Sequence, residues 1–130
     1  MVLKKLLIDT DGGVDDALAI LAALGAAEAE VVALTTVAGN VGLDQATANA
    51  GLIRRMFSPA CAVPVSRGLP AAHKTPRATA IHGEDGLGGI SGLRDEAGAP
   101  RYVWPVLSPA PLSAAEKIRA QCGVYGAGLT

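Results

Sequence analysis

Short apolar runs alternate with stretches of helical periodicity along the first half of the chain, and this alternation constrains the fold most. Runs at Leu3–Asp9, Glu30–Val37 and Ala62–Gly68 have the length and composition of strands. Between them, Asp15–Leu24 and Leu43–Phe57 repeat apolar residues at the spacing of amphipathic helices. Strands and helices that alternate with short connections imply parallel pairing by right-handed crossovers. The pattern therefore predicts an α/β fold, with an open, mostly parallel sheet and flanking helices.

The second half of the chain is less regular. Residues 70–111 are rich in Gly, Pro and Ala, and we expect a loop there with one short element around Tyr102–Leu107. A connection of this length is uncommon unless it covers a functional site. Ser113 and Glu116 form a capping box, which predicts a short helix over Ser113–Gln121. Residues 1–130 thus fit a single Rossmann-like domain.

Composition excludes several kinds of partner. A formal net charge of −1, with no surplus of basic residues, argues against nucleic acid. The apolar stretches are short and interrupted, so we expect neither a membrane-spanning helix nor a secretory signal. Cys61 and Cys122 lack the spacing of a metal or redox motif, so we expect free thiols and a cytoplasmic location.

Four aspartates cluster where the first strand gives way to the first helix: Asp9, Asp11, Asp15 and Asp16. Carboxylates this close need a counter-charge, or one of them must stay protonated. A hard divalent cation, calcium or magnesium, supplies that charge through oxygen ligands. Asp11 on the turn and Asp16 in the first helical turn can reach one ion from two sides. Asn40 follows the second strand, and ligands of such sheets bind beyond the carboxyl ends of the strands.

Two other interpretations of the acidic cluster are weaker. An EF-hand loop counted from Asp9 would place Gly13 and Val14 at its fifth and sixth positions, which does not fit. The plainer alternative is that Asp15 and Asp16 only cap the helix while the other two aspartates face solvent.

Three motifs together resemble the inosine–uridine nucleoside hydrolase family. "DTDGGVDDALAI" (residues 9–20) is similar to its N-terminal signature D-x-D-P-G-x-D-D-A, "TTVAGNV" (35–41) to its second motif, and "IHGEDGLGG" (81–89) to its third. The motifs occur in family order over roughly the first ninety residues. The resemblance implies a salvage enzyme that hydrolyses the N-glycosidic bond of purine or pyrimidine ribonucleosides to ribose and free base.

The same resemblance implies a role for individual residues. Asp11 and Asp16 match aspartate ligands of a tightly held Ca²⁺, and Asp11 also matches the residue that takes a proton from the attacking water. Asp15 matches a ligand of a ribose hydroxyl, and Asn40 matches a polar residue of the ribose and metal pocket. His82 lies in the stretch that approaches the leaving base.

Several features depart from the family pattern. Gly12 replaces the proline of the signature, which loosens the turn. Family members are more than twice as long, so the resemblance implies a truncated nucleoside-hydrolase fold. We expect its uncovered sheet edge and apolar face to drive formation of a homo-oligomer, or else poor folding. We expect Glu84 and Asp85 to be solvated or held by the neighbouring glycines, and Asp9 to be structural.

Two other functions fit part of the sequence. A haloacid-dehalogenase-like phosphatase uses a D-x-D-G motif after an apolar strand, with magnesium and an aspartyl nucleophile. "DTDGG" fits that motif loosely, but Gly13 replaces the usual Thr and the other two motifs are left unexplained. A non-catalytic remnant that binds metal or ribose without turnover is the other alternative.

Overall fold

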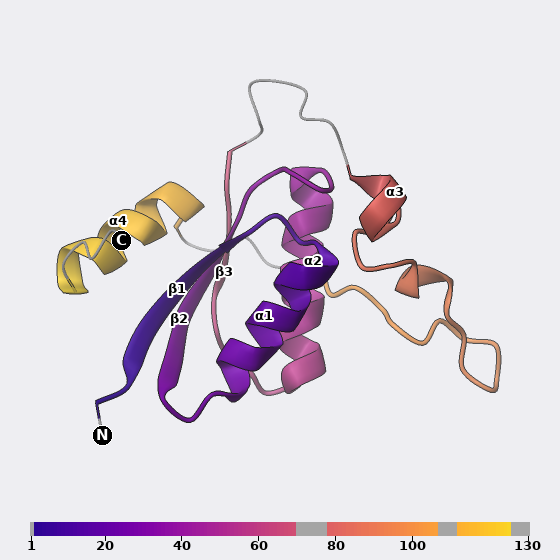
Figure 1. Cartoon of the computed structure of the whole chain (residues 1–130), viewed down its shortest axis with the longest axis horizontal. Helices are drawn as coiled ribbons and strands as arrows, with labels where there is room; N and C mark the ends of the chain where they lie inside the picture. The colour runs from indigo at the N-terminus through magenta and orange to yellow at the C-terminus, as the bar shows by residue number, and fades with distance from the viewer. Residues whose placement is uncertain (1, 70–77, 107–111, 126–130) are drawn as a thin grey trace.

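A three-stranded parallel sheet organises the computed structural model, which describes residues 2–69, 78–106 and 112–125 (Figure 1). The order is β1-β2-β3, so consecutive strands are neighbours. The first five elements are β1 (Lys4–Thr10), α1 (Val14–Gly25), β2 (Ala29–Thr36), α2 (Leu43–Phe57) and β3 (Val65–Arg67). The first four begin and end within one residue of their predicted bounds. The α/β class and the parallel sheet are thereby confirmed.

The register aligns the carboxyl ends of the three strands. Thr10 pairs with Thr36, and Thr36 pairs with Arg67, so the turns that follow β1 and β2 leave the sheet at one edge. Val32 has no partner on β1, because Leu6 pairs with Val31 and Leu7 pairs with Ala33.

β3 is shorter than predicted, because proline lacks the N–H that a strand donates to its neighbour. Pro64 does accept a hydrogen bond from the Leu34 N–H, at 2.9 Å, but the paired ladder starts only at Val65.

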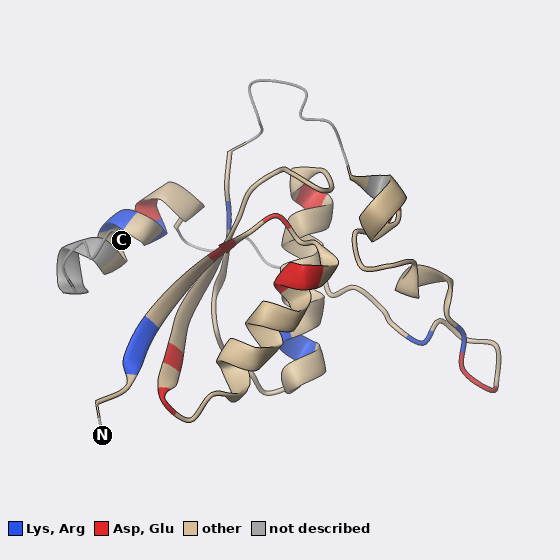
Figure 2. Ribbon diagram, in the orientation of Figure 1, with Lys and Arg blue, Asp and Glu red and all other residues tan. Residues whose placement is uncertain are grey.

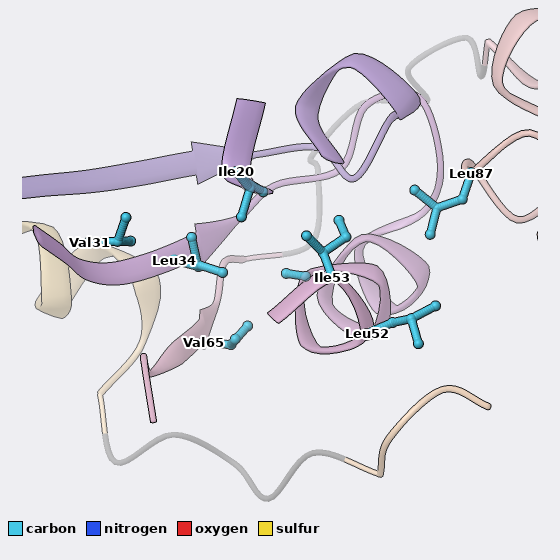
Figure 3. Packing of buried hydrophobic residues seen from close by; sticks show 8 residues of the cluster. Ile20, Val31, Leu34, Leu52, Ile53, Val65 and Leu87 are labelled. Atoms are coloured by element: carbon cyan, nitrogen blue, oxygen red, sulfur yellow. The ribbon is translucent and has the colours of Figure 1, made fainter. Parts of the chain in front are cut away.

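Helices α1 and α2 cover one face of the sheet and enclose the core (Figures 1 and 3). Ile20 of α1, Leu34 of β2 and Ile53 of α2 are fully buried there. Burying a side chain of this size contributes about 1.5–3 kcal/mol. Val65 joins them from β3. The apolar stripes read from the sequence are therefore the faces that hold both helices on the sheet.

The other face of the sheet is approached by α4 (Ala114–Tyr125), which contacts β2 and β3 (Figure 1). The predicted capping box is confirmed at its start. The Glu116 N–H donates to Ser113 Oγ at 3.3 Å, and Glu116 Oε2 accepts from the Ser113 N–H at 2.9 Å and from Ser113 Oγ at 2.8 Å. These hydrogen bonds, the backbone one first, lower the pKa of Glu116.

The segment between β3 and α4 contains two short elements, α3 (Thr79–His82) and a 3₁₀ turn, η1 (Ile90–Gly92). The element expected around Tyr102–Leu107 is not confirmed, because residues 102–106 form no regular structure and Leu107 lies outside the described residues. Tyr102 and Trp104 instead pack their side chains against the core. No helix in the described ranges combines the length and the apolar character that crossing a bilayer requires.

Candidate functional site

The acidic turn lies at the carboxyl edge of the sheet, where the sequence predicts a ligand site. Asp11 directly follows β1, Asp16 is in the first turn of α1, and Asn40 follows β2 by four residues. Figure 2 shows acidic positions gathered where β1 ends and α1 begins. Because the two strands end level with each other, their turns place these three side chains at one rim.

Asp16 turns back towards the end of β1. Its Oδ2 atom accepts hydrogen bonds from Thr10 Oγ1 at 2.8 Å and from the Asp11 N–H at 3.1 Å. Thr10 Oγ1 in turn accepts from the Gly12 N–H at 3.1 Å. The carboxylate therefore organises the turn between β1 and α1.

Asn40 holds the carboxylate of Asp11 from the neighbouring strand. The Asn40 carboxamide donates to Asp11 Oδ1 at 3.0 Å, and the Asn40 N–H donates to Asp11 Oδ2 at 3.2 Å. Gly39 leaves the necessary space, since a Cβ atom there would lie 2.4 Å from Asp11 Oδ2. Two polar residues that sequence analysis placed at one rim are thus in direct contact.

The carboxyl groups of Asp11 and Asp16 face each other. Burial raises the pKa of Asp11, and so does Asp16, through a hydrogen bond and through its charge. Burial also acts to raise the pKa of Asp16, but hydrogen bonds from Asp11 and Thr10 outweigh it and lower that pKa. The pair therefore retains a proton more readily than two separate carboxylates would, and a divalent cation relieves the same repulsion.

These two carboxylates fit part of the ligand set of a hard cation. Oxygen donors are what calcium and magnesium prefer, and calcium takes six to eight of them. Within residues 2–69, 78–106 and 112–125, no three or more His, Cys, Asp or Glu side chains are placed to hold an ion. The described part of the chain therefore supplies two facing acidic ligands and no complete cage.

His82 reaches the start of α1 from α3. Its Nδ1 atom accepts the Val14 N–H at 3.1 Å and lies 4.0 Å from Asp15 Oδ1, a contact that becomes an ion pair only if the imidazole is protonated. A Cβ atom on Gly13 would lie 2.5 Å from the Asn40 carboxamide nitrogen, 3.1 Å from Asp15 Oδ1 and 3.2 Å from His82 Cε1. Three predicted site residues therefore surround Gly13.

The remaining acidic residues of the motifs divide between structure and solvent. Asp9 accepts a hydrogen bond from Thr35 Oγ1 at 2.6 Å, which fits the structural role expected of it. Glu84 is exposed, as expected.

Asp85 is only 6% exposed, and it organises its loop. It accepts three backbone N–H groups, from Leu87 and Gly89 at 2.9 Å and from Ser91 at 2.8 Å. Burial raises its pKa, but the hydrogen bonds from the Ser91 and Leu87 backbones outweigh burial, so the pKa of Asp85 is lowered.

Asn49 of α2 lies beside the acidic turn although no sequence motif indicates it, and it is fully buried. Its side-chain nitrogen donates to the carbonyl oxygens of Gly12 at 3.0 Å and Asp85 at 2.7 Å. Its oxygen accepts from Gln45 Nε2 at 2.9 Å and from Trp104 Nε1 at 2.6 Å. The available signal was a polar residue on the apolar face of the second helix, beside Ala46, Ala50 and Ile53.

A parallel sheet with facing carboxylates and a carboxamide at its carboxyl edge defines an α/β protein of the class that binds ligands at its strand ends. The sequence profile of the family described as inosine-uridine preferring nucleoside hydrolase matches residues 6–126. The chain belongs to this family, and the resemblance drawn from the three motifs is confirmed.

Relatives of known name agree with this assignment. The inosine-uridine preferring nucleoside hydrolase of Leishmania major is 41% identical over 90 residues, which are 68% of this chain and 28% of that protein. Uridine nucleosidase 1 of Arabidopsis thaliana is 45% identical over 91 residues, 68% of this chain and 27% of that protein. This chain thus matches less than a third of the length of either relative.

Solved structures share the fold. A plant nucleoside hydrolase superposes with a TM-score of 0.77 at 31% identity, covering 94% of this chain and 36% of that one. A purine-preferring ribonucleoside hydrolase from Gardnerella vaginalis gives a TM-score of 0.76 at 30% identity, covering 95% and 37%.

Proposed function

We propose that the protein acts in hydrolysis of the N-glycosidic bond of ribonucleosides, releasing ribose and a free base. The observation that carries the proposal is the facing pair of carboxylates at the strand ends, Asp11 held by Asn40 and Asp16 held by Thr10. Family membership supports the reaction class, and residues 1–130 would form a single, incomplete nucleoside-hydrolase-like domain.

Asp11 and Asp16 would hold the ion, which we take to be Ca²⁺. When bound, such an ion lowers the pKa of a water ligand and orients a vicinal diol. Asp11 would take a proton from the attacking water. A carboxylate within hydrogen-bond reach of that water can act as its general base.

Asp15, Asn40 and His82 would serve the substrate. Cleavage of the bond builds positive charge on the sugar ring, which nearby carboxylates stabilise. The Asp15 side chain is 81% exposed, so it is free to accept a hydrogen bond from a ribose hydroxyl. Asn40 would line the ribose pocket beside Asp11. His82, whose side chain is 14% exposed, would meet the base as it leaves.

The decisive experiment supplies inosine or uridine with Ca²⁺ and follows ribose and base by chromatography. Base release is expected from the wild-type chain. It should fall by about 10²–10⁴-fold in Asp11→Asn, because the proton acceptor is lost. Asp95→Asn, which alters an exposed carboxylate remote from the acidic turn, should keep full activity.

Two results would overturn the proposal. Calcium binding that tightens with ribose, without any hydrolysis, would identify a non-catalytic ribose-binding protein. Phosphate release from a phosphomonoester, without base release from either nucleoside, would identify a phosphatase.

We also propose a cytoplasmic location and self-association. A free thiol at Cys61 is compatible with a reducing compartment. Leu18 and Ile81 are 66% and 80% exposed, and pairing between copies would cover such apolar side chains. Sedimentation should show a species larger than 13.0 kDa, and a compact monomer at all concentrations would contradict self-association.

A further inference from the structure

The acidic turn and the loop that carries His82 are joined at two points. One is the hydrogen bond from the Val14 N–H to His82 Nδ1. The other is the Asn49 side chain, whose single nitrogen donates both of its hydrogens, one to the carbonyl of Gly12 and one to the carbonyl of Asp85. Hydrogen bonds at two places thereby join the acidic turn to the loop that carries His82, although these segments lie almost seventy residues apart in sequence.

The chemistry of the position calls for a carboxamide. Asn49 is fully buried, and its nitrogen and oxygen are both used by neighbouring groups. An aspartate has the same size but no hydrogen to donate, so it would place an oxygen against two carbonyl oxygens. A glutamine would need space for a further methylene in a closely packed interior.

The surroundings of the Asn49 bridge are closely packed. A Cβ atom on Gly86 would lie 3.0 Å from the Gly12 carbonyl oxygen and 3.1 Å from the Asn49 side-chain nitrogen. On the other side, Trp104 Nε1 fixes the orientation of the carboxamide by donating to its oxygen at 2.6 Å. The bridge is therefore held in one orientation by groups from three separate parts of the chain.

We propose that Asn49 is a positioning residue, which sets the spacing between the acidic turn and His82 through its hydrogen bonds to Gly12 and Asp85. The inference rests on the proposed function only where it names Asp11 and His82 as parts of one site. Asn49 donates no hydrogen bond to Asp11 or His82 themselves. It acts through the backbone carbonyls of Gly12 and Asp85, which belong to the same two segments. Without the bridge, the Val14–His82 hydrogen bond is the one that remains between the two described segments, beside the packing of Leu87 in the core.

The experiment compares the wild-type chain with Asn49→Asp and with the matched control Gln45→Ala, by NMR under conditions where each protein is folded. Gln45→Ala removes one donor to the Asn49 oxygen and keeps both hydrogens of the bridge. In Asn49→Asp, hydrogen exchange of the Val14 amide should accelerate about tenfold or more, the ratio that corresponds to losing one net hydrogen bond. The ¹⁵N shift of His82 Nδ1 should move with it.

A purely structural role predicts a different result. General destabilisation would accelerate exchange throughout, including the amides that pair β1 with β2, whereas loss of positioning changes Val14 and His82 selectively. The proposal is overturned if folded Asn49→Asp leaves both signals unchanged, or if Gln45→Ala changes them equally. If Asn49→Asp does not fold, Asn49→Ala replaces it, because it removes the bridge without placing a carboxylate against two carbonyl oxygens. Faster exchange of the Val14 amide is then expected, and unchanged exchange would overturn the proposal.

A calcium titration of the same samples keeps the two proposals apart. If the wild-type chain shows no response to Ca²⁺ at Asp11 or Asp16, the proposed metal site fails. The response of Val14 and His82 to Asn49→Asp is read without the ion, so it still decides the role of Asn49.

Discussion

Asn40 donates two hydrogen bonds to the carboxylate of Asp11, one from its carboxamide and one from its backbone N–H, although 29 residues separate Asn40 from Asp11 in sequence. The contact exists because β1 and β2 are parallel neighbours that end level with each other. It leaves Asp11 oriented before any ligand arrives, which is a requirement for an effective ion site.

Replacing Asn40 with Ala should weaken binding of Ca²⁺ by roughly 10–100-fold, the usual effect of removing a group that orients a metal ligand. The backbone N–H of residue 40 remains, so the loss should be partial. Calorimetric titration measures it, with Gln45→Ala as the control on a nearby polar side chain. Equal affinity in Asn40→Ala and wild type would show that Asp11 needs no such support.

Replacing Gly12 with Ala should destabilise the chain more than replacing Gly98 with Ala. Both glycines have positive φ, +74° and +80°, a conformation that costs an L-residue about 1–2 kcal/mol. A Cβ atom on Gly12 would also lie 2.8 Å from Ala46 Cα, whereas one on Gly98 would meet nothing within 4 Å. Urea unfolding of the two variants isolates the packing cost as their difference. Equal losses of stability in Gly12→Ala and Gly98→Ala would show that α2 shifts at Ala46 to make room for the added Cβ atom.

Gly12→Pro, which restores the family signature, should be worse still. Proline fixes φ near −65° and cannot donate the hydrogen bond that the Gly12 N–H gives to Thr10 Oγ1. Circular dichroism during thermal unfolding should show a lower midpoint than for Gly12→Ala. A midpoint at or above the wild-type value would mean that the turn can take another path.

Asp85 should make the stability of the chain depend on acid pH. Its lowered pKa means that the carboxylate stabilises the native state fully above the unfolded-state value of about 3.9. That contribution is lost as the pH falls through the folded-state pKa. Urea unfolding at pH 7 and at successively lower pH should therefore show a steeper acid loss in wild type than in Asp85→Asn. The control is Asp95→Asn, which changes an exposed carboxylate that accepts two backbone N–H groups of a surface turn.

Ser113→Ala should loosen the start of α4 at a cost of about 1 kcal/mol, because the Glu116 N–H loses its acceptor and the Glu116 side chain loses Ser113 Oγ. Hydrogen exchange along the first turn of α4 measures the loss. Exchange in α1, on the opposite face of the sheet, serves as the internal control and should not change.

The first four regular elements were predictable from sequence because each depends on local periodicity. The apolar repeat of α2 gave its bounds to the residue, and the run before Asp9 gave β1 within one residue. The approach of Asp11 to Asp16 was also predictable, because the two residues are close in sequence and only a turn separates them. The contact of Asp11 with Asn40 followed once the strands were taken to be parallel.

The features that could not be predicted from sequence depend on contacts between distant segments. One short element was predicted around Tyr102–Leu107, but residues 102–106 are irregular, and the Trp104 indole there donates a hydrogen bond to Asn49. Asp85 lies among glycines, and its burial arises from how its loop folds over it. Gly25 ends α1 without the left-handed backbone that a glycine often adopts beyond a helix end.

The hydrogen bond from Val14 decides which nitrogen of His82 can act as an acid. A neutral imidazole carries one hydrogen, and here the lone pair of Nδ1 is occupied by the Val14 N–H, so that hydrogen must reside on Nε2. Any proton that the neutral ring delivers to a ligand therefore departs from Nε2. A flip of the His82 ring that exposed Nδ1 would leave the N–H of Val14, the first residue of α1, without its acceptor. The start of α1 therefore favours the tautomer with hydrogen on Nε2.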